Sequence, residues 1–320
     1  MSRQGPIDVF ASGAILAVAA ALLAACGGPH GAYTPSVPTE AEAARDAIRA
    51  LEREGRVTEA LEGYRRLCER ERPLGRACYD RARLLLREGA VAAGRSESLA
   101  FARRFPDSAM VQPAVKRLAR SYFETDETEA GLAALGALSG ELAETAAGAT
   151  VDREIARLYQ WTGDAAGESE ALERIAARGR WGSTLWDDAV WRLALLARAA
   201  GDDREEERQL SRLLAARERS RLIGSYASPF HGAALLRLGL LRERAGDTRG
   251  ALEALLELGD EETSRLRDDA LFEAARIRLG QGDMGGACAL LERVLGIKDA
   301  SAARKARALH RESGCGEKGR

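Results

Sequence analysis

A short turn signal, most often Gly followed by Asp, recurs along this chain and constrains its fold more than any other feature. The breaks follow one another at intervals of 34, 36, 38, 38, 45 and 36 residues, counted at Gly55, Gly89, Thr125, Gly163, Gly201, Gly246 and Gly282. A glycine in the left-handed conformation ends one helix, and an Asp or Thr beside it can cap the next. Between the breaks, apolar residues recur at helical spacing and no convincing strand-like alternation appears.

This period predicts the architecture. One turn per 34–38 residues is typical of a repeat built from two helices. We therefore predict an all-α fold of about seven antiparallel helix pairs over residues 40–312. The last helix, near residues 300–311, would cap the array, and the polar residues 313–320 would form a C-terminal tail.

A small residue stands five positions after the turn in several repeats, namely Ala60, Ala130, Ala251 and Ala287. In this the sequence resembles the tetratricopeptide repeat (TPR) family, over roughly residues 42–295. The resemblance implies a right-handed superhelix of antiparallel helix pairs, whose first helices line a concave face that holds a protein or peptide. Glu168 and Glu206 depart from the pattern at that position. A HEAT-like stack is the structural alternative.

The segment Phe105-Pro106-Asp107-Ser108 carries a second, looser resemblance. Periplasmic TPR proteins of the bacterial envelope often contain such a segment between repeats; examples are the TPR lipoprotein of the β-barrel assembly machinery and the TPR protein associated with Tol-Pal. Its physical role is that Pro106 ends one helix while Asp107 or Ser108 caps the next.

The N-terminus has the features of an export signal. Residues 9–25 are uncharged and Ala-rich, about the length of a signal-peptide core and short for a stable membrane span. They end in Leu23-Ala24-Ala25-Cys26, which resembles the bacterial lipoprotein lipobox at every position. The resemblance implies cleavage after residue 25 and lipid on Cys26, whose two or three acyl chains hold firmly. An uncleaved anchor, or an ordinary secretory signal with an accidental cysteine, is the alternative.

The residues after the cysteine bear on location. Gly27 replaces the Asp that retains enteric lipoproteins in the inner membrane, which implies the periplasmic face of the outer membrane rather than the inner membrane. Residues 26–39 are rich in Gly and Pro and read as a flexible tether.

Four further cysteines are Cys68, Cys78, Cys288 and Cys315. An exported chain permits disulfides, and proximity suggests Cys68–Cys78 and Cys288–Cys315. Three pairings are possible for four cysteines, and buried free thiols are a further alternative. A zinc site is disfavoured, because the sequence has no CxxC or HxxxH spacing.

Composition and motifs give no sign of enzymatic chemistry. The formal net charge of −1 indicates no general attraction to nucleic acid. The nucleotide-binding, zinc-protease, GxSxG and SxxK motifs are all absent, so we expect no cofactor, no metal and no catalytic residues. Paired acids such as Asp187-Asp188 are neighbours on a helix and point in different directions, which suits helix starts better than acid–base catalysis.

Aromatic residues offer candidate contacts for a partner. All four tryptophans fall within residues 161–191, and we single out Trp181 and Trp186, with core packing as the alternative. Trp191 is assigned to the core. The longest repeat adds Tyr226 and Phe230, for which an exposed loop and a helix start with Phe230 in the core are the two interpretations.

Together these features predict a lipid-anchored periplasmic scaffold that binds a peptide or an envelope protein, in cell-envelope assembly by analogy. The alternatives are a scaffold subunit of a peptidoglycan-processing, lytic-transglycosylase-like system, and a helper in secretin or pilus assembly. The repeats leave only a short segment after them, too little for a lysozyme-like catalytic domain.

Overall fold

The computed structural model describes residues 39–70, 75–178, 184–216 and 228–315. These residues form fifteen α-helices and no strand. Cys26, Trp181 and Tyr226 lie outside the described residues. Contacts divide the chain into two units, Met1–Arg56 and Val57–Arg320. No helix in the described part combines the length and apolar character of a membrane span.

The first unit contains α2 (Glu40–Arg53), which Thr39 and Glu42 cap reciprocally at its start. The helices of the second unit are α3 (Val57–Arg70), α4 (Arg76–Arg87), α5 (Val91–Arg104), α6 (Val111–Glu124), α7 (Thr128–Glu141), α8 (Ala146–Thr162), α9 (Ala165–Arg178), α10 (Thr184–Ala200), α11 (Asp203–Ala215), α12 (His231–Arg244), α13 (Thr248–Asp260), α14 (Arg267–Gly280), α15 (Met284–Leu295) and α16 (Ala303–Glu312).

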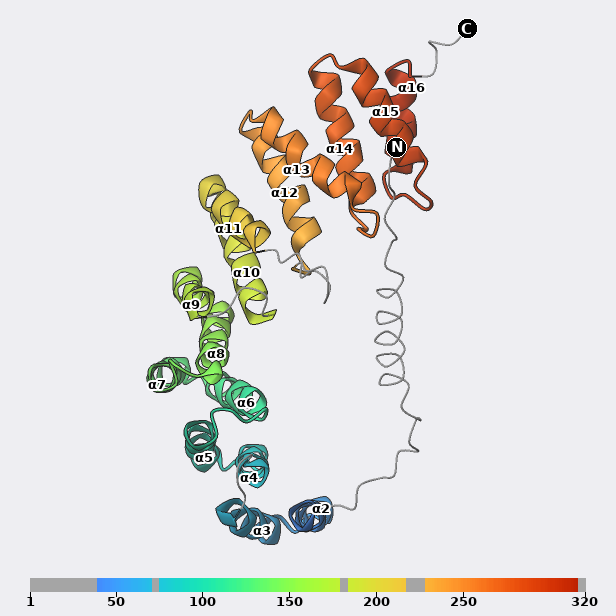
Figure 1. Ribbon diagram of the computed structural model, residues 1–320. Helices are drawn as coiled ribbons and strands as arrows, with labels where there is room; N and C mark the ends of the chain where they lie inside the picture. Colours follow the sequence, from blue (N-terminus) through green and yellow to red (C-terminus); the bar gives the residue numbers. More distant parts are fainter. Residues whose placement is uncertain (1–38, 71–74, 179–183, 217–227, 316–320) are drawn as a thin grey trace, which may run out of the picture. The chain divides into compact units, whose positions relative to one another are not determined.

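The second unit is a stack of helix pairs. Six pairs, from α4/α5 to α14/α15, follow one another, and α16 packs on α15. We call the first helix of each pair A and the second B. Figure 1 shows the A helices α4, α6 and α8 next to one another, with the B helices α5, α7 and α9 to the left of them. The predicted all-α, TPR-like superhelical architecture is confirmed.

The recurring turns lie between the A and B helices, as predicted. In every pair of the second unit one turn residue is left-handed, with φ between 59° and 83°, at Gly89, Asp126, Gly163, Gly201, Gly246 and Gly282. Only glycine adopts this conformation without cost, and Asp tolerates it better than most residues. The Asp after the glycine then caps helix B: Asp202, Asp247 and Asp283 accept hydrogen bonds from the backbone N–H three residues on, at 2.9–3.0 Å.

The two repeats that depart from the small-residue pattern are nevertheless regular. Glu168 and Glu206 each stand five residues after the turn glycine, where Ala251 and Ala287 are fully buried in the later pairs. Each glutamate is almost entirely buried, and both oxygens of its carboxylate accept hydrogen bonds from an arginine on the next A helix. The Glu168–Arg192 distances are 2.7 and 3.0 Å, and the Glu206–Arg237 distances are 2.5 and 2.9 Å.

These pairs are equivalent, because Arg192 and Arg237 both stand nine residues before the next turn glycine. A buried glutamate is tolerable only when a cation and hydrogen bonds satisfy it. A bidentate ion pair therefore replaces close packing of small residues at two successive repeat interfaces.

Two disulfides close the ends of the second unit. Cys68, near the end of α3, is joined to Cys78 at the start of α4, with Cα atoms 4.8 Å apart. Cys288 on α15 is joined to Cys315 after α16, with Cα atoms 5.5 Å apart. This is the pairing expected from proximity in the sequence. Cross-links of this kind stabilise mainly by restricting the unfolded chain.

Candidate functional site

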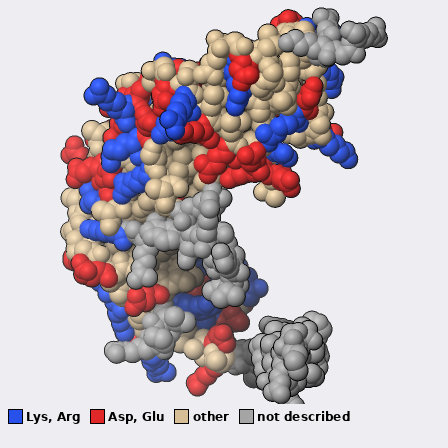
Figure 2. Space-filling view, turned by 45° about the horizontal axis from the view of Figure 1, so that its top comes forward, with Lys and Arg blue, Asp and Glu red and all other residues tan. Residues whose placement is uncertain are grey.

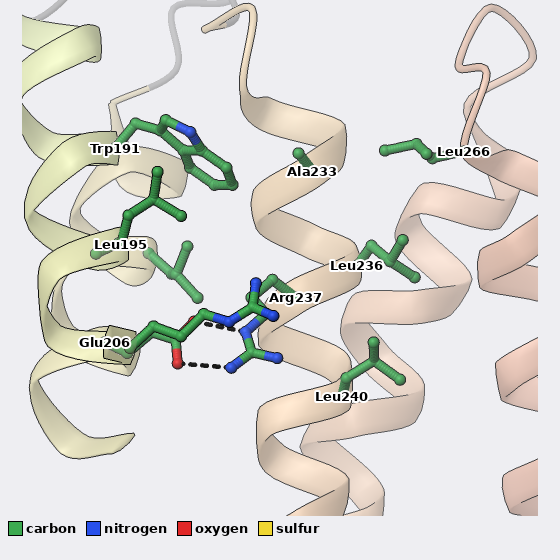
Figure 3. Close-up of a pocket in the computed structure, with 11 residues that line it drawn as sticks. Trp191, Leu195, Glu206, Ala233, Leu236, Arg237, Leu240 and Leu266 are labelled. Atoms are coloured by element: carbon green, nitrogen blue, oxygen red, sulfur yellow. Dashed lines mark hydrogen bonds and ion pairs between the residues drawn. The ribbon is translucent and has the colours of Figure 1, made fainter. Parts of the chain in front are cut away.

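A groove with an apolar lining opens between α10, α11 and α12, and reaches Leu266 before α14. Its cavity volume is about 240 Å³. The side chains that line it and carry the argument below are Trp191, Leu195, Arg198, Glu206, Leu236, Arg237 and Leu240. Figure 3 shows Trp191 projecting from α10 toward α12, with the Glu206–Arg237 pair spanning the gap below it.

Repeat geometry brings the apolar residues together. Trp191 and Leu195 stand ten and six residues before Gly201, and Leu236 and Leu240 stand ten and six residues before Gly246. Residues four apart lie on the same face of a helix. The same face of two successive A helices is therefore apolar, and all four side chains remain only half-buried. We call the positions six and ten residues before the turn residue the inner row.

Trp191, which lines the groove, forms an aromatic pair with Phe230. The rings of Trp191 and Phe230 stack with centroids 5.2 Å apart and planes 2° from parallel. Phe230 precedes α12, and its backbone N–H donates to the Ser228 hydroxyl at 3.2 Å. Offset stacking of this kind favours one orientation of the rings. The stack therefore holds the indole of Trp191 at the groove.

The charges in the groove are unequally compensated. The hydrogen bond from the Arg237 guanidinium to Glu206 raises the pKa of Arg237, so Arg237 keeps its positive charge opposite the carboxylate of Glu206. Arg198 is exposed at the groove and makes no hydrogen bond or ion pair with any residue that the structure describes. The groove thus offers apolar walls, one neutralised pair and one available cation.

The groove is small and mostly apolar. A volume of about 240 Å³ is below the roughly 300–1,000 Å³ typical of small-molecule and cofactor sites. It suits one large apolar side chain of a peptide or protein. No nucleophile lines the groove, and the described part of the chain holds no group of three or more His, Cys, Asp or Glu arranged for a metal ion.

The sequence-based candidates are distributed unevenly. Trp186 is buried at 5 % exposure in the core, with the Arg212 guanidinium 5.8 Å from its ring centroid, so the core interpretation left open above applies to it. Phe230 is the N-cap residue of α12, packs against the core and stacks on Trp191, so the helix-start interpretation applies to it. Trp181 and Tyr226 fall outside the described residues.

The residues that make the groove were not among the candidates from the sequence. Trp191, which the sequence assigns to the core, packs against the core as a half-buried residue and also lines the cavity. The signal that could have found it is its register: Trp191 and Leu195 match Leu236 and Leu240 at one repeat interval, whereas Trp186 lies five residues before Trp191, on a different face of the helix.

Charge marks no single large patch on the visible face of the molecule. Figure 2 shows Lys and Arg interspersed with Asp and Glu over most of the described surface. Many of these charges are paired, as in Arg103–Glu141 and Arg293–Asp260. Exposed pairs of this kind add little stability each.

Comparison with known proteins agrees with the repeat assignment. Residues 233–262, in α12 and α13, match the tetratricopeptide repeat family. No curated protein matches the chain.

Several solved structures resemble the chain at low identity. The C-terminal part of a TPR repeat-containing protein from Cytophaga hutchinsonii is 12% identical, with 82% of this chain and 98% of that chain covered and a TM-score of 0.46. A tetratricopeptide repeat protein from Parabacteroides merdae is 15% identical, with 86% and 98% covered and a TM-score of 0.35. YrrB, described as a TPR protein with an unusual peptide-binding site, is 14% identical, with 62% and 90% covered and a TM-score of 0.40.

The fold is that of a TPR-type array, and residues 233–262 match the TPR family. Arrays of this type are scaffolds for protein–protein interaction and bind protein or peptide partners.

Proposed function

We propose that this protein is a non-catalytic scaffold that binds a peptide or protein through the groove between α10 and α12. The observation that carries the proposal is the run of half-buried apolar side chains at equivalent positions of two successive A helices, Trp191 and Leu195 with Leu236 and Leu240. Apolar side chains held half-buried around a cavity are a favourable anchor site, because burying them releases water.

We further propose that the scaffold is exported and tethered to a membrane by lipid on Cys26, at the periplasmic face of the outer membrane, and serves envelope assembly. The Leu23–Cys26 motif and Gly27 support this location. Two disulfides in one chain support it independently, since disulfides persist in oxidising compartments and are rare in the cytosol.

The binding proposal is tested by photo-crosslinking in cells of the bacterium that encodes the protein. A photoreactive amino acid is placed at Leu240 in the groove and, as the control, at Arg249, whose side chain is 91% exposed on α13. We expect a discrete crosslinked species from Leu240 and not from Arg249. Adding Leu236→Glu to the Leu240 probe should abolish that species. No crosslink from Leu240, or equal products from both positions, would contradict the proposal.

The anchoring proposal has its own test. Mass spectrometry of the N-terminal peptide of the mature protein should find Cys26 as the first residue and carrying acyl chains. Cys26→Ser should leave the protein unprocessed and without lipid. A mature protein that starts elsewhere, or an unmodified Cys26, would overturn the anchor without affecting the groove.

A further inference from the structure

The inner row changes character along the array. It is apolar on α10 and α12, as described above. On α6 it is Lys116 and Arg120, and on α8 it is Arg153 and Arg157. The helices α6, α8 and α10 contact one another in succession, so these positions form one continuous strip within the second unit.

Cations outnumber anions on the basic half of this strip. Arg153 and Arg157 share one carboxylate, that of the fully buried Glu154, at 3.4 and 2.5 Å. Arg120 pairs with Glu124 at 2.6 Å, and both side chains remain more than half exposed. Lys116 is exposed and has no hydrogen bond or ion pair within the described residues.

Nearby charges confine this surplus to α6. Asp188 at the start of α10 interacts electrostatically with Arg153, so the two arginines of α8 face two carboxylates. On α6, Arg117 beside Lys116 adds a further cation, and its guanidinium donates to a neutral group, the Tyr79 hydroxyl, at 3.3 Å. The net positive charge of the strip therefore lies on α6.

A second cavity shows that this surface is hollowed as well as charged. A groove of about 270 Å³ lies between α4 and α6, at the same kind of junction between successive A helices as the apolar groove. Four arginines line it, Arg83 and Arg87 from α4 and Arg117 and Arg120 from α6, and Glu124 is the carboxylate in the lining. Arg83, Arg87 and Arg120 also pair with Asp80, Glu88 and Glu124. Guanidinium groups form directed, charge-assisted hydrogen bonds with carboxylates, and here they outnumber the carboxylate of the lining, so this groove favours acidic side chains.

We propose that the ligand is an extended peptide segment in which a cluster of Asp or Glu lies next to a large apolar side chain. The apolar side chain occupies the groove between α10 and α12, and the acidic cluster lies over the inner row of α6. Arg198, exposed at the apolar groove, contacts a carboxylate near the apolar residue. This inference rests on the proposed function and adds the class of ligand.

The test is selection from a display library of randomised dodecapeptides on the full chain, purified in mild detergent. Three proteins are compared: the unmodified chain, Lys116→Glu/Arg120→Glu, and a control that reverses two charges elsewhere, Arg249→Glu/Arg304→Glu on α13 and α16. Helical content by circular dichroism confirms that each variant is folded. The most enriched peptide is then synthesised and its affinity measured against all three.

The unmodified chain and the control should enrich peptides that combine acidic residues with one Leu, Ile, Phe, Met or Trp. Lys116→Glu/Arg120→Glu should lose the acidic preference while keeping the apolar one. The synthetic peptide should bind this variant about tenfold more weakly, a factor equal to about 1.4 kcal/mol, and more weakly as salt is raised.

The possible failures are distinguishable. Enriched peptides with an apolar residue but no acidic excess, or an acidic excess that persists in Lys116→Glu/Arg120→Glu, would overturn the ligand class and leave the scaffold function standing. An acidic excess without an apolar residue would place the ligand on the basic strip alone and also overturn the inference. Absence of any enrichment would count against the peptide-binding function itself.

Discussion

Replacing Arg237 by leucine tests the role of the buried Glu206–Arg237 pair between successive repeats. Glu206 is 1% exposed, and its two oxygens accept hydrogen bonds from Arg237 at 2.5 and 2.9 Å. Removal of one partner of a buried ion pair costs about 3–5 kcal/mol, because the other charge is left unpaired. Since the Arg237 side chain is 19% exposed, we expect about 3 kcal/mol, at the lower end of that range.

The double variant separates the pair from its burial. Glu206→Ala/Arg237→Leu restores the alanine that Ala251 provides one repeat later, and leaves no charge without a partner. We expect it to lie within about 1 kcal/mol of the unmodified chain, because exchange of a buried ion pair for apolar residues is often neutral.

Urea unfolding followed by tryptophan fluorescence measures both variants, and the equivalent pair Glu168–Arg192 provides a matched repeat of the cycle. If Arg237→Leu and the double variant lose equal stability, the loss does not come from the unpaired charge of Glu206, and the reasoning fails.

Three further outcomes follow from the structure. Gly246→Ala should destabilise the protein by about 1–2 kcal/mol through the positive φ of this residue alone, since an added Cβ meets nothing within 4 Å. Thermal unfolding measures the loss. Gly285→Ala in α15, where an added Cβ also meets nothing, is the control and should lose no stability. In urea unfolding, Cys288→Ser/Cys315→Ser should lower the free energy of unfolding by about 3.5 kcal/mol and Cys68→Ser/Cys78→Ser by about 2.7 kcal/mol, because the first disulfide closes the longer loop. The reverse order would contradict this explanation. The hydrogen bond from the Gly286 N–H, and after it that from Arg278, lowers the pKa of Asp283. The stabilisation from Asp283 is therefore present above its unfolded-state pKa of about 3.9 and is lost as pH falls through the lower folded value. Asp283→Asn should remove this pH dependence when unfolding is measured from pH 2 to 6.

The repeat architecture could be predicted because it rests on local signals. A left-handed turn residue and an Asp cap act within a few residues of sequence, so Gly246-Asp247 and Gly282-Asp283 reveal their turns directly. The cysteine pairs are also close in sequence, and each connects neighbouring elements. These features do not depend on contacts between distant repeats.

The groove could not be predicted in the same way, because it depends on contacts between repeats. In the sequence, Glu206 departs from the small-residue pattern without a visible reason. The reason is Arg237, 31 residues later, which pairs with it in the fold. Trp186 and Trp191 are the same residue type and lie on the same helix, α10. Only the rotation of α10 decides that the first faces the core and the second faces the groove.

The central claim is that ligands bind at the groove between α10 and α12. It is tested most directly by ¹⁹F NMR of the full chain labelled with 5-fluorotryptophan, titrated with the selected peptide. The account predicts that the Trp191 resonance shifts to saturation, while that of the buried Trp186 does not. A Trp191 resonance that is unchanged when the peptide is saturating would contradict it.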